Sequence, residues 1–194
     1  MSPANFQAHP RGTMEHNLEN TIALLTRTPA ALDALLRGLP ETWTEAGEGE
    51  GTWSVSTVLA HLTHAEHDNW MPRATVILQA GETQPFPPFP RDGYLHFKQG
   101  KSLGDLLDDF AKVRAQNIDK LRALHLSAKD LQRTGNHPSF GPVTLSQLVA
   151  TWAAHDLTHL HQISRVMAYQ YREAVGPWTR FLGVMQCSGH SVNT

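Results

Sequence analysis

Two histidines, His155 and His159, are four residues apart in an amphipathic stretch and belong to its apolar stripe. The stripe advances in steps of three or four residues, the spacing of one helix face: Leu148, Trp152, His155, His159, Ile163 and Val166. Imidazoles aimed at a core need polar partners, and one metal ion would satisfy both rings. The alternative is a pair of hydrogen-bonded core histidines. The one-turn spacing favours a metal, because zinc-binding helices use the same i, i+4 pair.

A third histidine, His61, lies on the apolar face of another predicted helix. In a helix bundle, metal sites form where facing helices project ligands inward. His61 with His155 and His159 would supply three neutral imidazoles and leave coordination positions open for water or substrate, which is typical of a catalytic metal site. His64 competes for the third position. The apolar neighbours of His61 indicate deeper placement and favour it.

Other residues whose side chains could take part in a reaction are less informative. Asp156 follows His155 and could orient a ligand or act as a base, but the pattern favours an ordinary solvated carboxylate. The single cysteine, Cys187, cannot form an internal disulfide, and nothing near it indicates thiolate activation. Three tryptophans could line a pocket, although helical spacing favours core: Trp53, Trp70 and Trp152. Most other histidines are expected on surfaces, loops or tails: His9, His16, His96, His125, His137, His161 and His190.

Four long amphipathic patterns must position the histidines. They predict helices over residues 14–37, 55–79, 102–124 and about 144–174. The first pattern continues through Pro29 and predicts one kinked helix, with a restart capped by Thr28 as the alternative. Pro72 interrupts the second. Capping boxes mark the third and fourth starts: Ser102 with Asp105, and Thr144 with Gln147.

The remaining segments are predicted to be connections. Residues 85–100 carry four prolines, which deny a regular helix or central strand, and a loop this long is more often functional or mobile than idle. Another loop covers 133–142, and a short terminal helix over 178–185 is expected to pack on the bundle. No alternating strand pattern competes. The sequence therefore predicts an all-α fold, an antiparallel four-helix bundle in a single domain over 1–194, with a flexible tail over 1–12.

Composition excludes several classes of function. The chain has 194 residues, 18% of them charged, and a formal net charge of -2 without a basic run, so a nucleic-acid partner is not expected. No stretch approaches the roughly 18 apolar residues of a membrane span, and no signal peptide is recognisable. We expect a cytoplasmic protein.

Several segments resemble the DinB-like superfamily, which includes the YfiT-type proteins. They are Trp53-Ser54-Val55 followed by His61-Leu62, the His155-Asp156-x-x-His159 segment ending in Gln162-Ile163, and the stretch from Tyr171 to Trp178. The resemblance implies an antiparallel four-helix bundle that is often dimeric. It also implies a metal triad on His61, His155 and His159, holding zinc or nickel, with iron or manganese as alternatives. His64 and His67 beside the first ligand depart from the family pattern.

Characterised relatives in this superfamily include thiol transferases. The leading expectation is therefore a metal-dependent thiol S-transferase, in which the ion activates a low-molecular-weight thiol to attack an electrophilic small molecule. A metal-dependent hydrolase is the second hypothesis. A non-catalytic metal-binding bundle is the third. The expected partners are a small-molecule substrate and a second copy of the chain.

Overall fold

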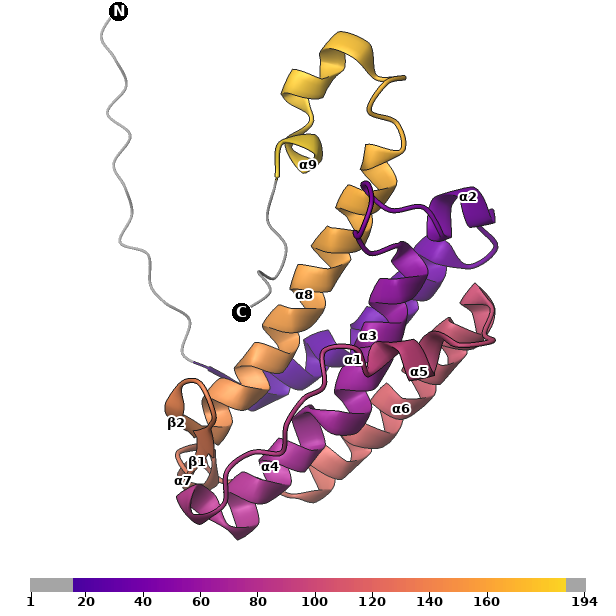
Figure 1. Cartoon of the computed structure of the whole chain (residues 1–194). Helices are drawn as coiled ribbons and strands as arrows, with labels where there is room; N and C mark the ends of the chain where they lie inside the picture. The colour runs from indigo at the N-terminus through magenta and orange to yellow at the C-terminus, as the bar shows by residue number, and fades with distance from the viewer. Residues whose placement is uncertain (1–15, 188–194) are drawn as a thin grey trace, which may run out of the picture.

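The computed structural model describes residues 16–187, which form a four-helix bundle with short additions (Figure 1). The long helices are α1 (Leu18–Leu36), α3 (Val55–Asp68) continued by α4 (Trp70–Gln79), α6 (Leu103–Ala123) and α8 (Leu145–Tyr169). The short elements are α2 (Glu41–Thr44), η1 (Gly81–Thr83), α5 (Tyr94–Lys98), α7 (Ala128–Leu131), β1 (Thr134–His137), β2 (Gly141–Thr144), η2 (Gly176–Phe181) and α9 (Gly183–Gln186). The predicted bundle is confirmed.

Helices α3, α6 and α8 each begin at a residue whose side chain caps the first turn. The side chain of Ser54 accepts a hydrogen bond from the backbone N–H of Thr57 at the start of α3. The predicted capping boxes open α6 and α8, where Ser102 and Thr144 each bond reciprocally with the residue three positions on. Each box satisfies backbone N–H groups that the first helical turn leaves without partners.

Two prolines lie inside helical segments, and they act differently. Helix α1 runs without interruption through Pro29, so the predicted single helix is confirmed and the restart at Thr28 is wrong. The second pattern does break, but at Asn69 rather than at Pro72. Pro72 is the third residue of α4, where a backbone N–H would have no partner within the helix, so its absence costs nothing. The ring of Pro72 would clash with the carbonyl of Asp68 in a continuous helix, so α3 ends at Asp68.

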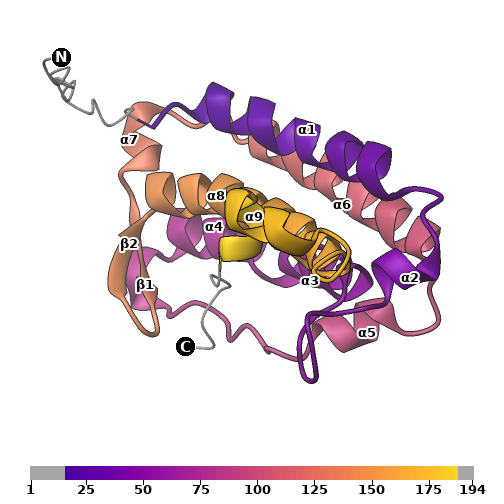
Figure 2. The same cartoon turned by 90° about the horizontal axis from the view of Figure 1, so that it is seen from above.

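The four helices run in two directions. One core cluster joins the C-terminal halves of α1 and α8 to the N-terminal halves of α3 and α6: Leu32, Leu36, Val55, Val58, Leu59, Leu62, Leu106, Leu107, Phe110, Ile163 and Val166. Thus α1 and α8 run one way, and α3 and α6 the other. The connection from η1 to α6, which carries α5, must return along the bundle and lies over one side of it (Figure 2). This connection covers the face where α3 meets α8.

Several short elements were not predicted, among them a hairpin and a short helix, because neither has a sequence period. The segment expected as a loop over 133–142 contains a two-stranded antiparallel hairpin that pairs Thr134 with Thr144 and His137 with Gly141. Gly141 has φ +71°, a left-handed conformation that favours glycine at a tight turn. The second element is α5, inside the proline-rich connection. Both are stabilised by tertiary contacts, and a segment of four or five residues is too short for its sequence to predict them.

The C-terminal segment differs from its prediction in detail. Helix α8 ends at Tyr169, earlier than expected, and the single predicted terminal helix is two short pieces, η2 and α9. Helix α9 folds back against α8 (Figure 1). Trp178 and Phe181 in η2 are 67% and 72% exposed, so the expected packing on the bundle holds for α9 rather than for η2.

Parts of the predictions lie outside the described residues. These are the tail over 1–12 and the two terminal histidines, His9 and His190. Among the helices of residues 16–187, none is long and apolar enough to cross a bilayer.

Candidate metal centre

The three predicted ligands meet between α3 and α8. The Nε2 atom of His155 is 3.1 Å from Nε2 of His61 and 3.1 Å from Nε2 of His159. All three ligand atoms lie within 4.8 Å of one another. The two helices run antiparallel, and the apolar stripe on each faces the other, so histidines placed within these stripes converge. The sequence placed each ring on a helix face, and the packing of the helices brings the rings together.

The ring geometry fits a shared cation. Three nitrogens bound to one ion at about 2.0–2.1 Å would be separated by roughly 3–3.5 Å, and two of the three pairs here are 3.1 Å apart. The Nδ1 atoms of His61 and His155 are buried and lack a hydrogen-bond partner among the described residues. The Nδ1 of His159 lies 2.7 Å from Oε1 of Gln162, so this nitrogen donates and Nε2 presents its lone pair to the centre.

Burial keeps the three rings neutral. It lowers the pKa of His61 from 6.5 to about 3, with smaller contributions from His159 and His64. It also lowers the pKa of His155 well below its usual value, helped by the other two rings and by Arg114. Burial lowers the pKa of His159 too, against the hydrogen bond that His159 donates to Gln162 and the charge of Asp156. Neutral imidazole is the form that binds a metal ion.

We expect the metal-free protein to lose stability as the pH falls from about 6.5 toward 3. In this range the unfolded chain takes up a proton on His61 and the folded protein does not. Each such group lowers the free energy of unfolding by at most roughly 1.4 kcal/mol per pH unit. Denaturant unfolding at pH 7, 6 and 5 with chelator measures the slope. The His61→Leu variant should give a shallower slope, and equal slopes would contradict this cause.

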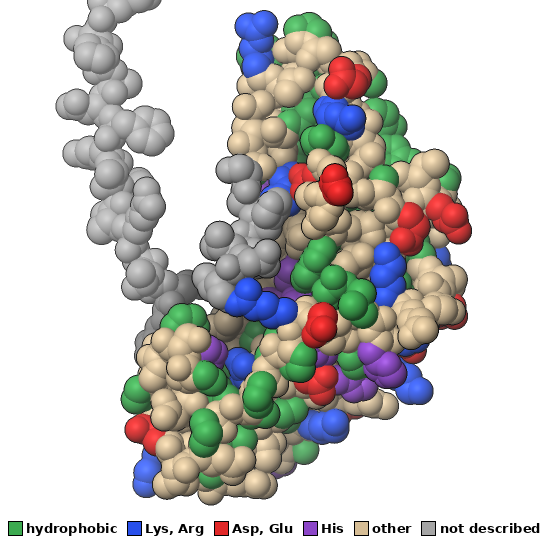
Figure 3. All heavy atoms as spheres, in the orientation of Figure 1, with side chains coloured by type: hydrophobic (Ala, Val, Ile, Leu, Met, Phe, Trp, Pro, Cys, Tyr) green, Lys and Arg blue, Asp and Glu red, His purple; other side chains and the backbone are tan. Residues whose placement is uncertain are grey.

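Aromatic side chains surround the triad. The ring of Trp53 lies 5.0 Å from that of His61 and stacks at 6.5 Å on His159. The edge of Trp70 meets His155 at 5.1 Å, and Phe89 from the proline-rich connection meets His61 at 6.0 Å. On the outside of this face, hydrophobic side chains lie beside histidines (Figure 3). Trp70 and Trp152 are core, as helical spacing favoured, whereas Trp53 lies at the site.

His64, the competing ligand, is placed elsewhere. Its side chain is 1% exposed, and Nε2 lies 3.2 Å from a carboxylate oxygen of Asp68. The ring is stacked between Phe89 at 4.2 Å and Phe97 at 5.6 Å. Burial lowers its pKa, partly offset by Asp68. His64 therefore anchors the connection over the bundle, and its neighbour His67 stacks on Phe97 as well.

Gly93 fits this anchor because it has no side chain. A Cβ on Gly93 would overlap the ring of His64, although the backbone is helical and would accept alanine. We expect Gly93→Ala to lower the free energy of unfolding by about 1–3 kcal/mol, the usual cost of overpacking. Gly104→Ala is the matched control, because a Cβ there meets only ordinary contacts, and it should be neutral or stabilising. If denaturant unfolding showed equal losses of stability for Gly93→Ala and Gly104→Ala, the proposed anchoring by His64 would be contradicted.

Beside the triad lies a buried ion network that the sequence pattern did not predict. Arg114 donates to both oxygens of Asp156 at 2.8 and 2.6 Å, and twice to Oε1 of Glu66 at 2.9 and 2.8 Å. Glu66 also accepts from Trp152 Nε1 at 2.7 Å and from Asn117. The solvated placement expected for Asp156 is wrong, because its side chain is fully buried. The sequence places Glu66 and Arg114 within apolar stripes at helical spacing, but this pattern by itself does not distinguish a buried charge from an exposed one.

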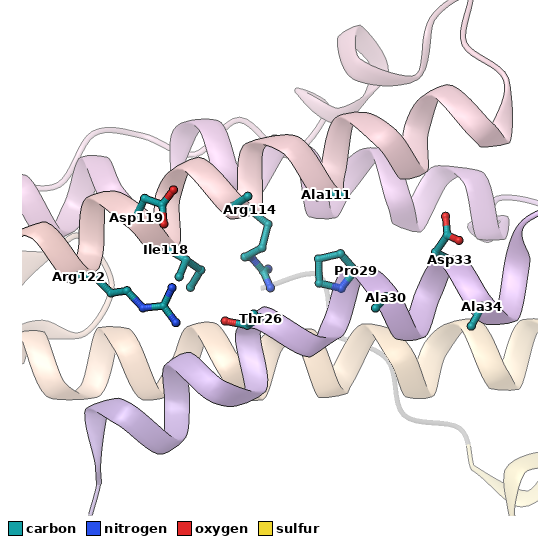
Figure 4. Close-up of a pocket in the computed structure, with 11 residues that line it drawn as sticks. Thr26, Pro29, Ala30, Asp33, Ala34, Ala111, Arg114, Ile118, Asp119 and Arg122 are labelled. Carbon is teal, nitrogen blue, oxygen red and sulfur yellow. The ribbon is translucent and has the colours of Figure 1, made fainter.

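The fifth N–H of Arg114 explains how α1 accommodates its proline. Pro29 has no N–H, so the carbonyl of Leu25 lacks its usual partner four residues on. Nη1 of Arg114 donates to this carbonyl at 2.9 Å. Pro29 and Arg114 both line a groove of about 550 Å³ between α1 and α6 (Figure 4). Alanines on both helices leave this groove open: Ala30, Ala34, Ala111 and Ala115.

The remaining candidates lie away from the centre. His96, His125 and His161 are exposed, as predicted. The surface placement expected for His16 and His137 is wrong, because both are half-buried. Cys187 is exposed, and its Sγ lies 3.2 Å from the carbonyl of Gly183.

Comparisons with known proteins agree with this architecture. The sequence profile of the DinB superfamily matches residues 24–163. No curated protein matches the chain. Among solved structures, YfiT from Bacillus subtilis is similar with a TM-score of 0.64 and 19% identity, over 86% of this chain and 94% of that chain. It is described as "a probable metal-dependent hydrolase with an unusual four-helix bundle topology". With a helical bundle and a profile match over most of its length, the chain belongs to the DinB superfamily.

Proposed function

We propose that the protein is a metal-dependent enzyme that hydrolyses a small molecule, with a divalent ion held by His61, His155 and His159. The observation that carries this proposal is the convergence of three imidazoles from α3 and α8 on one point, one of them buried and two half-buried. Three protein ligands leave positions open, which distinguishes catalytic from structural metal sites. The description of YfiT points in the same direction. An ion in such a site lowers the pKa of bound water to near 7 and polarises a carbonyl or phosphoryl oxygen.

The chain's own residues supply position and a dry environment. Gln162 fixes the tautomer and orientation of His159 by accepting from its Nδ1. Trp53, Trp70 and Phe89 pack against the rings and reduce their contact with water. The ion network around Arg114 joins α3 to α8, and therefore joins the two helices that carry the ligands. Exclusion of water strengthens each electrostatic interaction inside the site.

Metal loading followed by an activity screen tests the proposal. The full chain is stripped with chelator, reloaded separately with zinc, nickel, manganese or iron(II), and analysed for metal per chain. Each form is then assayed with chromogenic esters, amides and phosphoesters. We expect about one ion per chain and turnover only in a loaded form. Failure to bind any of these ions stoichiometrically would overturn the proposal.

The same screen decides between hydrolysis and thiol transfer. Both use the same three ligands and an open coordination position, so the histidine geometry supports them equally. Each assay is therefore repeated with a low-molecular-weight thiol and an electrophilic substrate. Turnover without thiol supports hydrolysis, and turnover that requires the thiol and consumes it favours an S-transferase.

A further inference from the structure

The buried ion network carries an unbalanced charge. The side chains of Arg114, Glu66 and Asp156 are 2%, 0% and 0% exposed, and one guanidinium faces two carboxylates. Their formal charges sum to one negative charge. Lys120 approaches only the amide oxygen of Asn117, at 3.3 Å, and lies at the exposed edge. A buried charge without a counter-ion is expensive unless another group nearby compensates it.

The network is directly connected to the metal ligands. Asp156 follows His155 in the chain, and Trp152, which donates to Glu66, lies one helical turn before His155. Because these charges are buried beside the rings, they interact with the centre through the protein interior rather than through water, where screening is much weaker. The network therefore fixes α8 at two points beside the triad and contributes to its electrostatic potential.

We propose, on the basis of the metal binding proposed above, that Glu66, Arg114 and Asp156 form a charge-balancing support for the metal centre. All five N–H groups of Arg114 are used, four on the two carboxylates and one on Leu25, which holds both carboxylates in place. With three neutral imidazoles the site would hold the full charge of a divalent ion. The negative charge of the network offsets part of it. These are positioning residues, since none has to touch the ion.

Replacing Glu66 with glutamine removes its charge but keeps its shape, and therefore tests whether the charge of the network supports metal binding. We expect Glu66→Gln to raise the zinc Kd about 10–100-fold, the range for changes in groups that support metal ligands. We expect its metal-free melting temperature to stay within about 3 °C of the wild type, because removing an unbalanced charge offsets the loss of hydrogen bonding. Zinc Kd is measured on the full chain by competition with a chromogenic chelator, and melting with excess chelator.

Two further variants separate charge from structure. Glu66→Asp keeps the charge and should bind zinc more tightly than Glu66→Gln. Asp109→Asn removes an equal charge from an exposed pair with Lys101 and should leave the zinc Kd unchanged. An unchanged Kd in Glu66→Gln, equal loss in Glu66→Asp, or failure of Glu66→Gln to fold without metal would overturn this inference. A wild type that binds no zinc or other tested ion would instead overturn the proposed function.

Discussion

Replacing His155 with alanine should abolish stoichiometric metal binding. His155 is the central ring, because its Nε2 lies 3.1 Å from the Nε2 atoms of both other histidines. Without it, only the imidazoles of His61 and His159 remain to bind the ion. We therefore expect the metal Kd to rise at least about 100-fold, beyond the effect of changing a supporting group. Metal content per chain after gel filtration, measured by elemental analysis, should fall from about one ion to background.

Thermal unfolding provides a second measure of the same variant. A ligand present at about 100 times its Kd stabilises a protein by roughly 2.7 kcal/mol, so metal should raise the melting temperature of the wild type and not that of His155→Ala. The control is His161→Ala, which removes an exposed histidine from the same helix. It should retain both the metal and the thermal shift. Loss of metal from His161→Ala, or its retention in His155→Ala, would contradict the assigned triad.

Replacing Arg114 with methionine should cause the largest loss of stability among these variants. The substitution keeps much of the apolar stem but leaves Glu66 and Asp156 buried without a cation. It also leaves the Leu25 carbonyl without a donor. Breaking a buried ion pair by removing one partner costs about 3–5 kcal/mol. Denaturant unfolding of the metal-free protein should show a loss of this size.

Arg37 offers a matched control for Arg114. It also bridges two carboxylates on different helices, Asp33 at 2.6 Å and Asp108 at 2.5 Å, but its side chain is 45% exposed. Because water solvates and screens such pairs, Arg37→Met should destabilise the protein far less than Arg114→Met. The two variants differ mainly in burial. Similar losses in both would mean that the buried network contributes no more to stability than a surface pair.

Much of the fold could be predicted because helical periodicity and capping are local properties. The stripe from Leu148 to Val166 identified the inward face of α8, and the capping boxes at Ser102 and Thr144 located two helix starts. The hairpin at Thr134–Thr144 and helix α5 could not be predicted in this way. They are too short to show a period and depend on the surfaces against which they pack.

The burial of the charged residues could not be predicted from the pattern of any single helix. Arg114 and Glu66 each interrupt an apolar stripe, which locally is indistinguishable from a stripe that widens into solvent. Asp156 received the same interpretation and is in fact fully buried. A buried charge is tolerated only with its partner, and these partners come from three different helices. Only the assembled bundle shows that the three residues compensate one another.

The chain alone determined which residues face inward, because side-chain spacing on a helix follows from backbone geometry. On that basis His61, His155 and His159 were assigned to two apolar faces. Tertiary structure decided that the faces belong to antiparallel neighbours, that His61 rather than His64 reaches the other two rings, and that a buried ion network lies beside them. Those outcomes depend on distances between segments about ninety residues apart, which packing sets and local sequence does not encode.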